Sequence, residues 1–393
     1  MRQNGSALLM VMMVLMMLGI WLLSDMPKLN SGNSEQDNAA ALAEAKDGLI
    51  GRSIQEDNRP GSLPCPDTDN DGEAEFFHGN ECPSYVGRLP WKTLRLPDLR
   101  DVHGERLWYA LSRNFRDDDS AEPINSDTKG TLKVYASDGT TDLTPAGSEA
   151  VAVIFAPGAA LGNQIRDEVA AACAATGTRI SRNLCADNYL DFSRGFDNAS
   201  PIGPFIEGEQ SATFNDQIRI IRAKDIMPLV EKRVAKVLRE ALAGYRSEYG
   251  YYPFPAKYDE CDASHCDSDA TVCRGRIPLN AEAAGTEAFF VSKWFVKNQW
   301  YREIYYSVGA DSLESSADLD PPCGHRLIVS GEQVDMVFFT PGTPLGAIVR
   351  PSNTLSDYLE DSENRDGWRF SANDVYVVPS STLNDRDRIY TLP

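Results

Sequence analysis

Carboxylates alternate with small or polar residues in one short segment, Asp67-Thr-Asp69-Asn-Asp71-Gly72-Glu-Ala-Glu75. Side chains at every second position of a tight loop can turn inward together, and Gly72 permits the sharp bend that such a loop needs. Ca²⁺ binds through oxygen ligands, and carboxylates are the strongest of these in proteins. The spacing therefore makes Asp67, Asp69, Asp71 and Glu75 the candidate ligands of a calcium site.

The acidic segment is similar to the first half of an EF-hand loop, without its second half. An EF-hand closes with Glu at the twelfth position, and His78 stands there in this chain. A calcium site would thus have to be completed by Glu75 or by backbone carbonyls. The alternative interpretation is a solvated acidic turn, because Asp, Asn and Gly are the commonest turn residues.

Two pairs of cysteines bracket short segments of the chain. Cys65 and Cys82 enclose the acidic segment, so a bridge between them would clamp it, and Cys173 and Cys185 enclose a second segment. Outside the cytoplasm such pairs favour disulfides. Four further candidates have a connectivity that spacing does not reveal, namely Cys261, Cys266, Cys273 and Cys323.

Zinc is the competing interpretation of the later cysteines. Cys261, His265, Cys266 and Cys273 offer the right atoms, but they lack the paired spacing of about two to four residues that structural zinc sites show on both sides. Disulfides are the expected state.

No recognisable catalytic constellation occurs in the sequence. The chain has neither a G-x-S-x-G nucleophile motif nor a glycine-rich phosphate loop. Its four histidines share no metal-ligand spacing: they are His78, His103, His265 and His325. We therefore expect a protein that is not an enzyme.

Length and charge limit the remaining classes. The 393 residues allow two or three domains with real cores, and 42% hydrophobic residues exclude global disorder. The formal charge is −20, and no cluster of Lys and Arg is present to follow a phosphate backbone. Nucleic acid is not an expected partner.

The elements that must hold these residues occur twice. Six blocks recur in the same order, and the longest pairs residues 153–162 with 337–346, while the last pairs Thr213-Phe-Asn-Asp216 with Thr382-Leu-Asn-Asp385. Generic turn signals do not explain a ten-residue match. The repetition predicts two copies of one module, at residues 39–222 and 225–393.

Each copy opens with helical spacing and continues with strand candidates. In the second copy, apolar residues from Val230 to Tyr245 recur at steps of three and four, which indicates a helix with one buried stripe. The following short segments are rich in β-branched and aromatic residues, among them Val151–Phe155 and Val334–Phe339, with Val375–Val378 as a late strand. The expected fold class is α+β, with each module an amphipathic helix packed on an antiparallel sheet.

The N-terminus carries a long apolar stretch. Ala7 to Leu23 contains no charge, and its seventeen residues reach the lower limit for a helix that spans a bilayer. We expect a transmembrane helix at residues 6–24 and a polar linker at 25–38. Arg2 on the short side places the bulk of the chain on the far side of the membrane.

Gly5, followed by Ser6 and the apolar stretch, resembles a prepilin-type leader, the mark of type IV pilins and type II secretion pseudopilins. The resemblance implies a leader at residues 1–5, cut between Gly5 and Ser6 by prepilin peptidase, with methylation of the new N-terminus. It also implies assembly with other pilin-like subunits through the N-terminal helix. Major pilins have Glu at the fifth residue after the cut, where this chain has Met10, which resembles the large minor subunits at filament tips.

The sequence thus predicts a membrane-anchored, pilin-like structural subunit of an envelope filament or secretion pseudopilus, in a minor or tip position. Its expected location is the inner membrane, crossed once, with the bulk of the chain periplasmic or extracellular. The alternative is an uncleaved, membrane-anchored extracytoplasmic binding module that uses calcium. An anchored hydrolase is a third alternative, without a constellation to support it.

Overall fold

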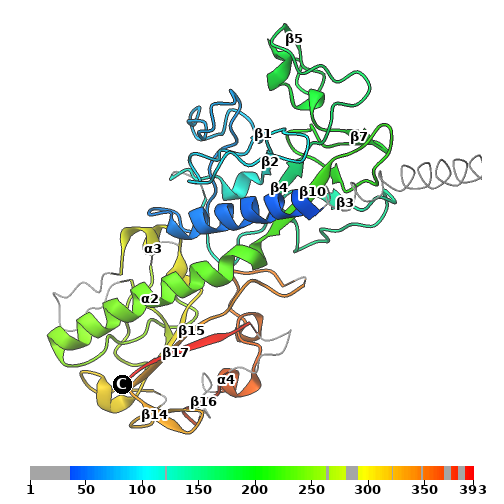
Figure 1. Cartoon of the computed structure of the whole chain (residues 1–393). Helices are drawn as coiled ribbons and strands as arrows, with labels where there is room; N and C mark the ends of the chain where they lie inside the picture. The colour runs from blue at the N-terminus through cyan, green and yellow to red at the C-terminus, as the bar shows by residue number, and fades with distance from the viewer. Residues whose placement is uncertain are drawn as a thin grey trace, which may run out of the picture.

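The computed structural model describes residues 36–119, 122–262, 265–279, 291–320, 322–346, 348–366, 373–378 and 386–393 (Figure 1). The predicted leader, with Gly5 and Ser6, and the predicted spanning helix at 6–24 lie outside the described residues, as does most of the linker. The block Thr382–Asp385 also lies outside them.

The N-terminal half, residues 36–222, contains one four-stranded antiparallel sheet. Its strands run in the order β1-β2-β4-β10. Their bounds are β1 (Val86–Arg88), β2 (Trp108–Leu111), β4 (Ala150–Ala156) and β10 (Gln217–Arg222). Every residue of β4 is buried, because this apolar strand is covered on both faces.

The C-terminal half, residues 223–393, contains a second sheet of the same kind. Its antiparallel strands run in the order β11-β12-β15-β17. Their bounds are β11 (Arg274–Arg276), β12 (Tyr305–Val308), β15 (Met336–Thr340) and β17 (Arg388–Leu392). The pairing registers correspond: Ala156 pairs with Gln217 in the first sheet, and Thr340 pairs with Arg388 in the second.

Two long helices lie between these sheets, the first at residues 36–55 and the second α2 (Ala223–Tyr249) (Figure 1). Lys46 of the first helix pairs with Asp225 of α2 at 3.0 Å. Helix α2 lies where the apolar spacing predicts it, although it begins five residues before Pro228. It ends at Gly250, whose φ of 87° is the left-handed conformation that glycine adopts at low cost.

A single hydrophobic core joins both halves. It contains buried residues of both long helices and of both large sheets, for example Leu49, Ile154, Leu238 and Phe338. The other face of each sheet has a smaller cluster of its own, around Phe155 in the N-terminal half and around Phe339 in the C-terminal half. The two halves therefore share one interior.

The connections between the main strands form additional small sheets. A parallel pair joins β3 to β9, antiparallel hairpins join β5 to β6 and β7 to β8, and a three-stranded sheet has the order β14-β13-β16, with β13 and β16 parallel. The bounds are β3 (Val134–Tyr135), β5 (Ala170–Ala172), β6 (Arg179–Ser181), β7 (Phe192–Ser193), β8 (Phe196–Asp197), β9 (Phe205–Ile206), β13 (Leu327–Val329), β14 (Glu332–Val334) and β16 (Val375–Tyr376).

Short helical turns complete the described chain. They are α3 (Lys293–Lys297), α4 (Ser362–Asp366), η1 (Arg113–Phe115), η2 (Arg182–Leu184), η3 (Ala186–Asn188), η4 (Trp300–Arg302), η5 (Ala310–Ser312) and η6 (Leu355–Asp357).

The expected fold class is wrong. Instead of a membrane helix followed by two simple helix-on-sheet modules, the described chain is a mixed α/β protein with six sheets and four α-helices. The reason lies in the long connections, such as residues 157–216, which satisfy their backbone hydrogen bonds by local pairing. Parallel pairs arise because segments distant in sequence meet side by side.

No helix within the described residues is long and apolar enough to cross a membrane. Helix α2 is the longest of them, but its apolar residues form one stripe and its other face carries charged groups. This finding contradicts the expected transmembrane fold and the expected single-pass location in the inner membrane.

Candidate metal-binding loop and its surroundings

The acidic segment begins beside the first sheet, where its backbone forms hydrogen bonds with β1. Asp67 N–H donates to the carbonyl of Arg88 at 3.0 Å, and Arg88 N–H donates back to the carbonyl of Asp67. Gly87 of β1 allows this approach, because a Cβ there would lie 2.5 Å from the carbonyl oxygen of Asp67. The backbone of the loop is therefore held against β1 at its first carboxylate.

The Asp67 side chain then folds the loop back on itself. One of its oxygens accepts a hydrogen bond from Asn70 N–H at 2.6 Å, and the other accepts one from Gly72 N–H at 2.8 Å. Both Asn70 and Gly72 have positive φ, at 68° and 89°. Asn and Gly tolerate this conformation best, which explains the local sequence.

This turn brings three of the four predicted ligands together. Carboxylate oxygens of Asp67, Asp69 and Asp71 lie within 4.8 Å of one another, with Asp67 buried and the other two exposed. Burial, together with the negative charges of Asp71 and Asp69, raises the pKa of Asp67 to about 6, although the N–H groups of the turn oppose this rise. A divalent cation would relieve both the repulsion and the desolvation.

Glu75, the fourth predicted ligand, is not part of this cluster. One of its carboxylate oxygens accepts hydrogen bonds from the Thr68 N–H, at 3.0 Å, and from the Thr68 hydroxyl. Two backbone carbonyls of the turn accept hydrogen bonds from cationic side chains, Asn70 from Arg106 at 2.7 Å and Asp71 from Lys92. The loop thus offers three carboxylates, and water would have to supply the remaining ligands of a calcium ion.

All eight cysteines form disulfides, which confirms the expected state. Cys65 bonds Cys82 across the acidic loop, and Cys173 bonds Cys185, as the bracketing predicts. In the C-terminal half the structure decides the connectivity, which is Cys261–Cys266 and Cys273–Cys323. The zinc interpretation is wrong, because the three cysteines that it needs are oxidised.

Sequence reasoning missed a buried arginine in each half. Arg88, the last residue of β1, lies over the rings of Trp108 and Tyr189, with its guanidinium carbon 4.9 Å and 4.4 Å from the ring centroids. Arg166 lies over the same tyrosine at 4.4 Å and donates to the carbonyl of Gly158. Arg88, Trp108 and Tyr189 are buried, so we assign the stack a structural role.

The C-terminal half repeats this stack at the corresponding strand positions. Arg276 ends β11 and lies over Tyr305 and Tyr358, at 5.3 Å and 5.1 Å. Arg350 lies over Tyr358 at 4.8 Å and donates to the carbonyl of Gly342. A sequence signal for these stacks was present, because Arg88 and Arg276 stand at the same position of the recurring blocks Gly87-Arg-Leu-Pro90 and Gly275-Arg-Ile-Pro278.

Comparison of this chain with protein-family models, with curated proteins and with solved structures finds no match. Its function therefore has to be inferred from its own residues and their geometry.

Proposed function

We propose that this protein is a pilin-like structural subunit, in a minor or tip position, of an envelope filament or secretion pseudopilus. The observation that carries the proposal is Gly5 directly ahead of Ser6 and the uncharged stretch Ala7–Leu23. Prepilin peptidase would cut between Gly5 and Ser6, and the apolar stretch would then contact other pilin-like subunits. Met10 in place of Glu favours an end position over the repeating shaft.

The globular part supports a structural role. Each half contains one four-stranded antiparallel sheet with a long helix ahead of it, and two disulfides close loops in each half. Disulfides persist in oxidising surroundings, where extracellular assemblies also operate. The buried arginine stacks add rigidity rather than a reactive group.

Mass analysis of the N-terminus tests this proposal. We expect the full chain to lose residues 1–5 and to carry a methylated Ser6 when it is expressed with prepilin peptidase, and to keep them without it. A Gly5→Leu variant should remain uncut, while Asn4→Ala should be cut like the wild type. A chain with an intact N-terminus in the presence of active peptidase contradicts the proposal.

Calcium-dependent binding is the second candidate function, and the three converging carboxylates favour it. We expect Ca²⁺ to raise the melting temperature relative to a chelator, because the ion binds the folded turn and not the unfolded chain. Asp69→Ala should abolish this shift, while Glu332→Ala, which removes an exposed carboxylate on β14, should leave it intact. A shift of the same size in Asp69→Ala would remove the site.

A further inference from the structure

The acidic loop presents an exposed aromatic ring next to its carboxylates. Phe76 is 88% exposed, the most exposed of the large hydrophobic side chains in the described chain. Asp69, Asp71 and Glu73 precede it and are also exposed. We call Phe76 and these three carboxylates the acidic tip.

The acidic tip is held in one shape. The Cys65–Cys82 disulfide closes the loop at its base, and the Glu73 carboxylate accepts a hydrogen bond from the Thr93 hydroxyl at 3.1 Å. A preorganised loop loses little conformational entropy when it binds a partner. The tip therefore has the rigidity of a recognition element.

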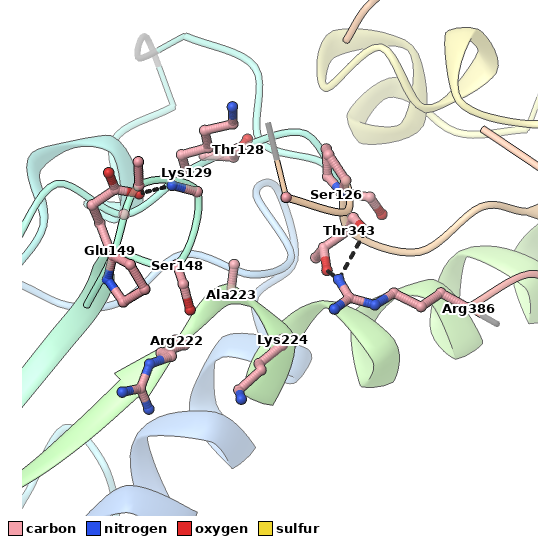
Figure 2. Close-up of a pocket in the computed structure, with 16 residues that line it drawn as sticks. Ser126, Thr128, Lys129, Ser148, Glu149, Arg222, Ala223, Lys224, Thr343 and Arg386 are labelled. Atoms are coloured by element: carbon pink, nitrogen blue, oxygen red, sulfur yellow. Dashed lines mark hydrogen bonds between the residues drawn. The ribbon is translucent and has the colours of Figure 1, made fainter. Parts of the chain in front are cut away.

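A basic pocket lies where the two halves meet. It is formed by the loop at 145–149, the start of α2 and the loop at 343–346 (Figure 2). The two loops touch through backbone, because a Cβ on Gly147 would lie 2.6 Å from the carbonyl oxygen of Gly346. We call this cavity the junction pocket.

The junction pocket has room for one aromatic side chain. Its volume is about 250 Å³, and its walls include Pro145, Ala146, Ala223 and Pro344. An apolar cavity of about 150 Å³ already accommodates benzene. A phenylalanine ring therefore fits, with space for rearrangement at the rim.

Positive charge surrounds the junction pocket in a chain of net charge −20. Among its lining residues, Glu149 carries the one negative charge, and it pairs with Lys133 at 3.7 Å. Lys129 and Lys224 are exposed and lie on opposite sides of the pocket in Figure 2. The remaining basic residues of the lining are Arg222 and Arg386.

We propose that the acidic tip of one copy of this chain docks in the junction pocket of a second copy, with Phe76 as the anchor. Buried aromatic anchors with a charged rim are typical of protein interfaces, and complementary charge sets their register. This proposal rests on the subunit role proposed above, and it adds a contact between the globular parts of neighbouring subunits.

The contact would be head to tail. No residue of the acidic tip lines the junction pocket, so each copy can offer its tip to one neighbour and its pocket to another. Two different surfaces that meet in this way generate a ring or an open filament, in contrast to the closed pair of a two-fold dimer. This geometry would suit a filament component.

Sedimentation velocity on the full chain tests the contact. The protein is kept in a mild detergent that covers residues 7–23, and in a chelator that leaves the acidic tip fully charged. We expect the weight-average mass to rise with protein concentration up to about 1 mM, and to fall when NaCl rises from about 0.1 M to about 1 M, because the rim charges are then screened. Phe76→Ser should weaken association by roughly tenfold or more, because the loss of a buried aromatic anchor costs an interface at least that much.

Two single-surface variants give a sharper result. Phe76→Ser damages only the tip, and Lys129→Glu with Lys224→Glu damages only the pocket, so each should be monomeric alone. Their mixture should form one-to-one dimers and nothing longer, because one intact tip and one intact pocket remain. Phe192→Ser, which removes another exposed phenylalanine, on β7, is the matched control and should associate like the wild type.

Three outcomes would overturn the proposal: a wild-type chain that stays monomeric throughout, association that Phe76→Ser leaves unchanged, or a mixture of the two variants that stays monomeric. A pocket that binds only a small anion would give the first of these. None of the three affects cleavage after Gly5, so failure of this contact and failure of the subunit role are separate results.

Discussion

The Asp67 carboxylate both holds the acidic turn together and lies buried beside two other carboxylates. Its two oxygens hold the turn by accepting N–H groups of Asn70 and Gly72, yet the carboxylate is buried beside Asp69 and Asp71. Burial raises its pKa from 3.8 to about 6. The folded chain therefore holds a proton on this group over a pH range in which the unfolded chain has lost it.

This raised pKa predicts a stability that falls as the pH rises. The contribution of protonated Asp67 to the free energy of unfolding is fully present below about pH 4 and is lost as the pH rises through about 6. Between about pH 4 and about pH 7, the free energy of unfolding should fall less in Asp67→Asn than in the wild type, by on the order of 1 kcal/mol in calcium-free buffer. Urea unfolding of both proteins at each pH measures the difference.

The comparison must use the pH dependence, because the amide introduced by Asp67→Asn keeps one acceptor oxygen and loses the other, which changes stability at every pH. Asp117 also has a pKa raised to about 6 by burial, and its effect cancels between the two proteins. Equal pH dependence in wild type and variant would contradict the role assigned to Asp67.

Arg276 shows how a buried charge is accommodated by aromatic rings and a backbone carbonyl, in addition to the charge of buried Glu303. It is 3% exposed, stacks on tyrosine rings and donates from Nε to the carbonyl of Tyr258 at 3.0 Å. A planar guanidinium can stack and donate in its plane at once, whereas an ammonium cannot.

Arg276→Lys should therefore lower the free energy of unfolding by about 2 kcal/mol, through lost stacking and lost donors. Arg88→Lys should cost a similar amount, because Arg88 occupies the corresponding place in the N-terminal half. Arg302→Lys, at a half-buried arginine that donates to a Gln299 side chain, is the control and should cost much less. Urea denaturation measures all three; a neutral Arg276→Lys would show that the stack is incidental.

At the scale of elements, the Cys65–Cys82 bridge matters because the acidic loop has few apolar contacts to hold it. The two cysteines are 17 residues apart, and β1 follows shortly after the second. Closing a loop of this length restricts the unfolded chain more than the folded one.

Replacing both Cys65 and Cys82 by Ser should lower the free energy of unfolding by about 3 kcal/mol and should weaken the calcium-dependent rise in melting temperature. Replacing Cys173 and Cys185, which are 12 residues apart, should cost a similar free energy and leave the calcium effect unchanged. Calorimetry of both double variants, with Ca²⁺ and with chelator, measures the loss of stability and the calcium effect separately. An undiminished calcium shift without Cys65–Cys82 would mean that the loop keeps its shape unaided.

The whole molecule is held together by a buried polar contact as well as by the shared core. Asp127 of the N-terminal half pairs with Arg350 of the C-terminal half at 2.7 Å, and the Arg350 side chain is 1% exposed. Glu303 is also buried here, and its pKa is raised well above the ordinary value by burial and by the charge of Asp127. Next to this group, Ser126 donates a hydrogen bond to buried Glu231 of α2.

Arg350→Met should destabilise both halves together, by about 3–5 kcal/mol, because it leaves Asp127 without its partner. Because the core is continuous, unfolding should remain a single transition by fluorescence and by circular dichroism. Arg326→Met removes a pair between an exposed arginine and buried Asp335, which keeps its second pair with Arg246, and should cost less than about 1 kcal/mol. Separate transitions for the two halves would contradict this view.

Local patterns were readable in the sequence because they depend on neighbours along the chain. The spacing in α2 identified its buried stripe, and the alternation of Asp67, Asp69 and Asp71 identified a turn that gathers carboxylates. Bracketing also paired Cys65 with Cys82. In each case the interacting groups are close in sequence, so few alternative partners compete.

Long-range pairing was not readable, and the last strand illustrates why. Sequence matching aligned Asp216 with Asp385 and took Val375–Val378 as a late strand, but 375–376 joins β13 in a different sheet. The structure makes Asp387 the counterpart of Asp216: Asp216 accepts from the N–H of Asp191 at 2.8 Å, and Asp387 accepts from that of Glu360 at 2.9 Å. A shift of two residues preserves which side chains face the core, so the pattern alone could not exclude it.

The sequence by itself determined the residue types of this protein, its local helices and turns, and the recurrence of short blocks. Only the tertiary structure decided that Cys273 bonds Cys323, that the long connections form sheets of their own, and that the two halves share one core. The physical reason is that such contacts join residues many positions apart. They are selected by the total packing of the chain, and spacing along the chain does not specify them.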